Sequence, residues 1–291
     1  MVASRQYTLL WRSRKGIRLP RYATRRISFL MQLYFDHIAG QAEKRELVYA
    51  PATAIFEKSE YEYALRTGWQ VISSWGDGQF EWFEKHKSAG TRVWYQSRTS
   101  RLTPDEYVEK KRHRQRIRKA AGLRYEIHSQ YDIETMRSIY VDYLRSRGFT
   151  DLYGEDHPFS SSPYGGERMI IVYYLMDSPV AFSIIDIVGS SGVATQFCWN
   201  YEMPNLQLGK ISYYIEQQEA KKRGLKHIYL GSSYEDGSKS KCNYAGFEWW
   251  TGRIWSRDLE LYKELATNET KMKTLEDLYQ QQQLFYSKLD I

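Results

Sequence analysis

The densest group of chemically active side chains in this sequence is the cationic run from Lys110 to Lys119. Eight of its ten residues are Lys, Arg or His. Like charges at this density repel one another along a helix, so anionic counter-charges stabilise such a segment. Nucleic acid supplies them, and neutralising several phosphates gives strong, salt-sensitive binding. We predict that this run contacts RNA; the alternative interpretation is a solvated charged face.

Two further basic segments extend this prediction. Residues 1–30 contain eight Lys or Arg and no acid. Trp11 and Tyr22 lie among these cations, a pattern typical of an arm on phosphates and bases, although a solvated tail is an equal alternative. The net charge of +7 is compatible with an anionic partner. The predicted RNA-binding residues are Arg98, Arg101, Lys110, Lys111, Arg112, Arg114, Arg116 and Arg118.

Several common catalytic and targeting features are not found. The sequence has no GxSxG, HExxH, P-loop or GxGxxG pattern in a suitable context. Its six His lack ligand spacing, and Cys198 and Cys242 form neither a disulfide scaffold nor a CxxC zinc motif. We therefore expect no metal and no bound cofactor. The sequence also has no apolar signal segment and no long apolar run, so a cytoplasmic location is expected.

Capping and periodicity predict the elements of the first half. Thr103, Pro104 and Glu106 match a capping box, which predicts a long exposed helix from Thr103 to Gly122. Residues 27–38 are expected to form a helix or a broken strand pair. The other predicted elements are strands at 45–51, 53–56, 69–74 and 91–95, with a helix at 58–67 and a polar loop at 96–101.

The second half predicts alternating strands and helices. Gly and Pro punctuate apolar runs of strand length, and the helical segments have apolar residues on one face. In residues 132–147 the inward positions are Met136, Ile139, Tyr143 and Tyr140. The predicted strands are 123–127, 168–175, 179–188, 193–199, 227–231 and 248–255, and the predicted helices are 132–147, 208–225, 258–265 and 271–288.

An ordered series of short motifs carries a family resemblance. The series is Leu208-Gly209, Gln218-Glu219-Ala220, Tyr229-Leu230-Gly231, then Lys241-x-x-Tyr244 and Phe247. It resembles the C-terminal half of the arginyl-tRNA–protein transferases, and weaker similarity begins near residue 47. The resemblance implies a GNAT-like acyltransferase fold and the transfer of an amino acid from tRNA to a protein N-terminus. The fold class is then α/β (α+β), with an N-terminal α+β subdomain (1–120), a GNAT-like domain (121–258) and C-terminal helices (259–291).

The same resemblance suggests the catalytic residues. Lys241 and Tyr244 match the family's Lys-x-x-Tyr and would lie near the ribose and carbonyl of the donor. Asp186 matches a strand Asp that could orient or deprotonate the acceptor amine. The structural alternatives are an exposed Lys, a core Tyr and a strand-end Asp that bonds to a loop. The predicted substrate-binding residues are Trp199, Asn200, Gln207, Gly209, Ser232 and Ser233.

Departures from the family pattern leave the substrates open. The chain lacks the paired cysteines of the family's N-terminal half. Asn200 replaces an acid, Gln207 replaces a small residue, and the spacing changes around Gly246. Arginyl-tRNA is therefore only the first donor to test, and the amine acceptor is a protein, a peptide or a small molecule.

Two rival functions remain. One is a CoA-dependent N-acyltransferase, although residues 205–212 contain one Gly and make a poor clamp for a pyrophosphate. The other is a non-catalytic RNA-binding protein on a transferase-derived fold. An aminoacyl ester is already activated, so transfer from aminoacyl-tRNA needs orientation and oxyanion stabilisation rather than a cofactor.

Overall fold

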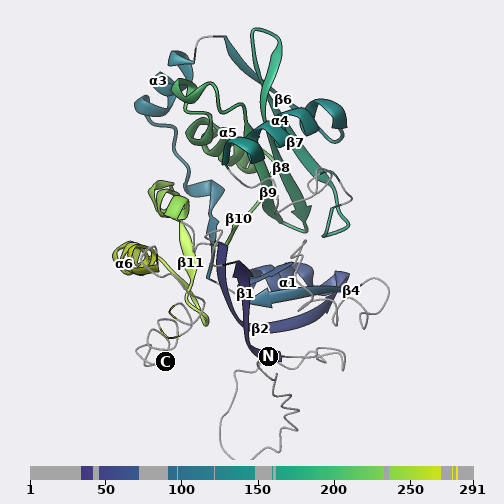
Figure 1. Cartoon of the computed structure of the whole chain (residues 1–291), viewed down its shortest axis with the longest axis vertical. Helices are drawn as coiled ribbons and strands as arrows, with labels where there is room; N and C mark the ends of the chain where they lie inside the picture. The colour runs from purple at the N-terminus through teal and green to yellow at the C-terminus, as the bar shows by residue number, and fades with distance from the viewer. Residues whose placement is uncertain are drawn as a thin grey trace, which may run out of the picture.

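The computed structural model describes residues 34–41, 46–71, 91–96, 98–120, 122–147, 159, 162–232, 236–269, 277 and 280. Figure 1 shows two β-sheets, with the purple and blue strands of the first half below the teal and green strands of the second. The predicted basic arm at 1–30 lies outside the described residues, as does nearly all of the predicted helix at 271–288.

The smaller sheet has four antiparallel strands in the order β1-β2-β4-β3. Residues 34–38 of the segment predicted at 27–38 lie in β1, so the helix option is wrong for them. The break expected in the strand option at Asp36 and His37 is wrong too, because β1 runs through both residues. The predicted strand end at Pro51 is wrong, because β2 continues through this residue. Pairing between β2 and β4 starts only at Ala52, so Pro51, which has no N–H, does not have to donate a hydrogen bond to β4. The elements are β1 (Tyr34–Gln41), β2 (Glu46–Glu57), η2 (Lys58–Glu60), α1 (Tyr61–Arg66), β3 (Trp69–Val71) and β4 (Thr91–Gln96).

The larger sheet has eight strands in the order β12-β11-β5-β10-β9-β8-β7-β6. All neighbours pair antiparallel except β9 and β10, which are parallel. The strands are β5 (Thr99–Leu102), β6 (Leu123–His128), β7 (Arg168–Leu175), β8 (Ser178–Val188), β9 (Ser191–Trp199), β10 (His227–Ser232), β11 (Glu248–Trp250) and β12 (Trp255–Ser256). The helices are η3 (Pro104–Glu106), α3 (Lys111–Lys119), α4 (Ile133–Arg147), η4 (Pro204–Leu206), α5 (Leu208–Lys222), η5 (Asp236–Asn243) and α6 (Leu259–Glu269).

Helices cover both faces of the larger sheet. Ile170 and Val172 of β7 pack in the cluster that contains α4, whereas Ile171 and Tyr173 pack in the cluster that contains α5. Successive side chains of a strand point to opposite faces, so β7 is buried on both. The predicted α/β class is confirmed, with the GNAT-like order of strand, helix, three antiparallel strands, helix and parallel strand.

The parallel strands β9 and β10 pair over a short length only. Their register joins Ser191–Val193 to His227–Tyr229. Beyond this point β9 continues beside β8, and the end of β10 continues beside β5. The two strands therefore separate toward their C-terminal ends. Tyr213 of α5 packs over this region, because it belongs to the cluster that contains Ala194 of β9 and Leu230 of β10. Tyr244 belongs to the same cluster.

Three predicted elements need correction. The long helix predicted from Thr103 is instead three segments: the short helix η3, an extended segment, and α3. The chain is extended between the two helices because Thr103 donates its N–H to Gly246 O (3.0 Å) and because Tyr107 is buried. Part of the predicted loop at 96–101 is strand β5. The predicted strand 248–255 is the hairpin of β11 and β12, whose turn is closed by a 3.0 Å bond from Thr251 N to Ile254 O. None of the helices in the described residues is long and apolar enough to cross a membrane.

The two sheets share a core. Tyr61 and Trp94 of the smaller sheet's layer pack with Tyr164 and with Val188 and Val193 of the larger sheet. Polar contacts join the same parts: Ser190 N donates to Glu62 Oε1 (2.9 Å), and Trp255 Nε1 donates to Arg66 O (2.8 Å). Because β5 precedes residue 121 yet lies within the larger sheet, the three-part domain division stays a prediction.

Candidate active site and nucleic-acid interface

A stack of three rings attaches the basic helix α3 to α5. The rings of His113 and Tyr214 lie 3.9 Å apart and are nearly parallel, and Tyr107 stacks on His113 at 5.7 Å. Arg116 Nη1 donates to Tyr214 Oη at 2.6 Å. Burial and then the neighbouring cations, Arg112 first, lower the pKa of His113, so the imidazole is neutral near pH 7. The basic run therefore has one uncharged, buried residue by which it packs.

The predicted catalytic Tyr244 lies beside this stack. Its ring is 6.1 Å from that of Tyr214 and 4.3 Å from that of Tyr213. Burial, followed by the nearby Tyr214 hydroxyl and Glu216 carboxylate, raises the pKa of Tyr244. Its hydroxyl stays protonated and can donate a hydrogen bond. Lys241 Nζ donates to Leu230 O on β10 at 3.0 Å. The ring of Tyr214 thus contacts both His113 of the basic helix and Tyr244 of the Lys-x-x-Tyr pair.

Glu216 is a buried carboxyl that the sequence interpretation missed. It is 4% exposed, and Ser183 Oγ on β8 donates to its Oε1 at 2.6 Å. Burial raises the pKa of Glu216 to about 7 although the Ser183 bond lowers it, and its charge in turn raises the pKa values of Tyr213 and Tyr244. A signal for it existed: Glu216 lies four residues after Ser212 and eight after Leu208, on the inward stripe of the helix.

Asp186 is held by protein groups on both carboxylate oxygens. It is 0% exposed; Arg168 Nε donates to Oδ1 at 2.9 Å and Thr195 Oγ1 donates to Oδ2 at 2.6 Å. Neither partner belongs to the Lys241 and Tyr244 group. The structural alternative was a strand-end Asp that bonds to a loop, but both partners of Asp186 lie on the neighbouring strands β7 and β9. Its catalytic role stays a prediction.

The predicted substrate residues fall into two places. Trp199 lies in a row of rings, 5.2 Å from Phe197 and 4.9 Å from Tyr143. Gly209 lies against the same row, because a Cβ at Gly209 would be 4.0 Å from Trp199. Asn200 is used locally, since its Oδ1 accepts the N–H of Glu202 at 3.0 Å. Ser233 and the side chain of Ser232 lie outside what the structure describes.

Gln207 lies instead in a pocket of about 240 Å³ between α3 and the turn before α5. Arg112 and Arg116, predicted to bind RNA, line the same pocket, so the fold brings residues from the two separate predictions together. Gln207 has a positive φ of 51°, a strained conformation for a residue other than Gly. The lining residues are Arg112, Gln115, Arg116, Lys119, Ala120, Asn205, Leu206 and Gln207.

The predicted RNA-binding residues separate into exposed and buried groups. Lys110, Lys111, Arg112, Arg114 and Arg118 are exposed, with Arg116 half-buried. Two arginines before the helix need correction. Arg98 is 2% exposed. Arg101 forms a 2.7 Å ion pair with Glu248 and packs its guanidinium on the Trp255 ring, so neither is placed to reach phosphates. The candidate interface is therefore α3.

Comparison with known proteins identifies the second half. The family model described as "Arginine-tRNA-protein transferase, C terminus" matches residues 122–246. These residues are therefore similar to the C-terminal part of that family. The match includes α5, Asp186, Lys241 and Tyr244, and it begins just after α3. A comparison with curated protein sequences gave no match.

Several solved structures have distant similarity to this chain. The C-terminal domain of a putative lysylphosphatidylglycerol synthetase from Agrobacterium fabrum has 12% identity and a TM-score of 0.38, over 60% of this chain and 55% of that one. L-PGS from Bacillus licheniformis has 12% identity and a TM-score of 0.37, over 62% and 54%. FemX has 10% identity and a TM-score of 0.45, over 72% and 71%. The chain thus spans about half the length of the first two.

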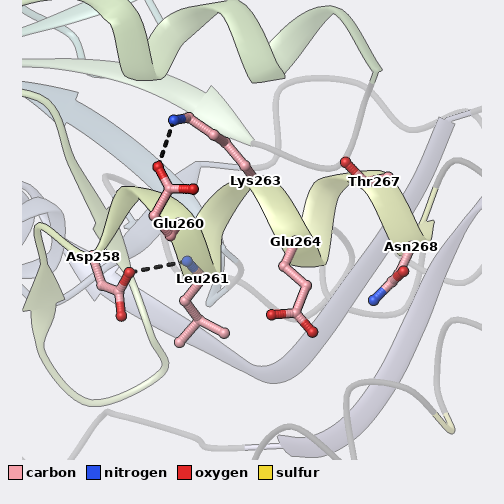
Figure 2. A pocket seen from close by; sticks show the side chains of 7 residues that line it. All are labelled: Asp258, Glu260, Leu261, Lys263, Glu264, Thr267 and Asn268. Atoms are coloured by element: carbon pink, nitrogen blue, oxygen red, sulfur yellow. Dashed lines mark hydrogen bonds and ion pairs between the residues drawn. The ribbon is translucent and has the colours of Figure 1, made fainter.

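A separate hollow of about 610 Å³ lies along α6, outside the transferase family match. Figure 2 shows its lining side chains, where Asp258 Oδ1 accepts the N–H of Leu261 and Lys263 donates to Glu260. The lining residues are Asp258, Glu260, Leu261, Lys263, Glu264, Thr267 and Asn268. None of them belongs to the predicted site.

Proposed function

We propose that this protein is a tRNA-dependent aminoacyltransferase that forms an amide bond. The donor is an aminoacyl-tRNA, with arginyl-tRNA the first to test, and the acceptor is an amine of a protein, peptide or small molecule. One observation carries the proposal: residues 122–246, which match the arginine-tRNA-protein transferase family model, lie against a basic helix, and the same ring of Tyr214 contacts His113 of this helix and Tyr244 of the Lys-x-x-Tyr pair.

Aminoacyl transfer requires the protein to orient the two substrates and to stabilise the negative charge of the tetrahedral intermediate. The amine nitrogen attacks the ester carbonyl of the donor, and the ribose oxygen leaves with a proton. Tyr244 is protonated and can donate to the oxyanion, and the Lys241 cation can stabilise the same charge or hold the ribose. Trp199, Gly209 and Ser232 remain candidate contacts for the aminoacyl group. No bound cofactor takes part, and aminoacyl-tRNA is a co-substrate.

Glu216 is our candidate for the group that accepts the amine's proton. A general base works best when its pKa is near the operating pH, and burial raises the pKa of Glu216 to about 7. Its Oε1 accepts the Ser183 bond, whereas Asp186 has both oxygens committed to Arg168 and Thr195.

Charged tRNA is used in the cytoplasm, so we propose that location.

The proposal is tested with bulk tRNA charged with radiolabelled amino acids, arginine first. Candidate acceptors are incubated with the protein and analysed by mass spectrometry. We expect an amide product heavier by one amino-acid residue.

Two outcomes would contradict the proposal and identify the rival. Acetyl-CoA binding in calorimetry, with indifference to tRNA, indicates a CoA-dependent acyltransferase. Binding of tRNA that survives Lys241→Ala and Asp186→Ala, with no product from the unmodified chain either, indicates a non-catalytic RNA-binding protein.

A further inference from the structure

The pocket between α3 and the turn before α5 is lined by three cations. Arg112, Arg116 and Lys119 line it together with the amide side chains of Gln115 and Gln207. Among the residues that the structure describes, none of these three cations forms an ion pair with a carboxylate. Cations that share one space without a neutralising carboxylate repel each other, so the pocket favours an anion.

The basic helix presents two different faces. The pocket residues 112, 115, 116 and 119 follow helical spacing and form one stripe. The other exposed cations, Lys111, Arg114 and Arg118, form a second stripe outside the pocket, where Arg114 lies 3.8 Å from Glu109 Oε2. The two faces carry three cations each, and the first face lines the pocket.

The pocket is held in shape before any ligand arrives. Arg116 is fixed by its 2.6 Å bond to Tyr214, and the helix is anchored by the His113 stack on the same ring. Preorganised arginines lose little entropy when they bind a phosphate. The volume of about 240 Å³ equals roughly eight water molecules at ~30 Å³ each. It accommodates a phosphate with part of one nucleotide, and it is too small for a base-paired stem.

We propose that this pocket binds a phosphodiester of the single-stranded 3′ end of the donor RNA. The second stripe then contributes only general attraction to the RNA backbone. This inference rests on the proposed function for the source of the phosphate. Pocket binding would hold the 3′ end beside Tyr214, whose ring lies 6.1 Å from that of Tyr244.

The test compares two variants with the same loss of charge. The pocket variant is Arg112→Gln, Arg116→Gln, Lys119→Gln, and the matched control is Lys111→Gln, Arg114→Gln, Arg118→Gln. Affinity is measured for intact tRNA, for tRNA whose single-stranded 3′ end has been removed, and for CoA. We expect the pocket variant to bind intact tRNA about 10- to 100-fold more weakly, because charged hydrogen bonds are lost. It should bind the shortened tRNA as the unmodified protein does.

The control variant should lower the affinity for both RNAs by the same factor, and the salt dependence of RNA binding should become less steep. Equal effects of the two variants on intact tRNA would overturn the inference, as would equal weakening of intact and shortened tRNA by the pocket variant. Tight CoA binding that only the pocket variant loses would overturn the RNA assignment and the proposed function together. Transfer activity that survives in the pocket variant at unchanged tRNA affinity would overturn this inference alone.

A gentler pair of variants guards against misfolding. Gln115→Glu adds one carboxylate to the pocket and leaves the His113 and Arg116 contacts in place. Lys111→Gln changes the charge by the same amount on the outer stripe. We expect Gln115→Glu to weaken the binding of intact tRNA about tenfold. The change in the logarithm of the affinity caused by Lys111→Gln should be less than half as large. The opposite order would contradict the pocket assignment.

Discussion

Packing around single residues determines which of the predicted site residues can react. Lys241 and Tyr244 were found through a short motif, and the structure shows how burial keeps the Tyr244 hydroxyl protonated. Glu216 had no motif, because its burial depends on Ser183 from a strand 33 residues away in sequence. Asp186 was predicted from its place on a strand, but the sequence could not show that Arg168 and Thr195 take both of its oxygens.

Glu216→Gln is expected to stabilise the protein at pH 8 and to change little at pH 5. Burial raises the pKa of Glu216 from the ordinary 4.5 to about 7, so the folded state binds more protons than the unfolded state between these values. The free energy of unfolding therefore falls as pH rises through this window. Gln removes a cost of ~3 kcal/mol that applies above pH 7. Urea unfolding of the variant and the unmodified protein at pH 5 and pH 8 measures this difference in the free energy of unfolding.

Glu219→Gln is the matched control for this prediction. Glu219 is also buried on α5, but it accepts bonds from Tyr125 (2.8 Å) and Lys222 (2.6 Å). Its replacement should destabilise the protein at both pH values. A Glu216→Gln effect of equal size at pH 5 and pH 8 would show that the carboxyl does not titrate in this window.

Tyr244→Phe is expected to slow transfer by roughly 10²- to 10³-fold, as the loss of one oxyanion donor does. The phenyl ring keeps the contact with the Tyr213 ring, so tRNA affinity should change by less than about twofold. Single-turnover kinetics with charged tRNA separates the two effects. Tyr213→Phe removes the neighbouring hydroxyl as a control. If Tyr213→Phe slows transfer equally, the special role of Tyr244 is wrong.

At the scale of elements, most strands and helices follow from apolar periodicity, and the failures have a common cause. Thr-Pro-Asp-Glu matches a helix start, yet α3 begins at Lys111 because the burial of Tyr107 and the bond from Thr103 to Gly246 favour an extended chain. Strand β5 was missed because its partners β10 and β11 lie more than a hundred residues away. Long-range pairing overrides local propensity in both places.

Tyr214→Ala is expected to release α3 from α5, because one ring carries the His113 stack and the Arg116 bond. The loss of a buried aromatic costs about 3 kcal/mol or more. Amide hydrogen exchange over residues 111–119 should accelerate, and tRNA affinity should fall. Tyr214→Phe keeps the stack and loses one hydrogen bond, about 1 kcal/mol. Protection of 111–119 that is unchanged in Tyr214→Ala would show that α3 is held by other contacts.

At the scale of the whole molecule, the position of the smaller sheet on the larger one could not be predicted from the sequence. The hydrophobic pattern predicts that each sheet has a buried face, but not that Trp250 of β11 packs over Gly68, next to β3. Gly68 directly follows the helix predicted at 58–67, and its φ of +79° is typical of a glycine that ends a helix. Its closeness to an indole ring from the other sheet is a tertiary feature.

Gly68→Ala tests this packing, and Gly224→Ala provides the matched control. Both glycines have a positive φ, 79° and 70°, so both alanine variants have the same backbone cost, about 1 kcal/mol or slightly more. At Gly68 the added Cβ would lie only 2.4 Å from the Trp250 indole, whereas at Gly224 nothing lies within 4 Å. Crowding adds about 1–3 kcal/mol at the first position only. Gly68→Ala should therefore unfold at a clearly lower urea concentration than Gly224→Ala and should alter tryptophan fluorescence before global unfolding. Equal destabilisation by the two variants would show that the sheets do not meet at this point.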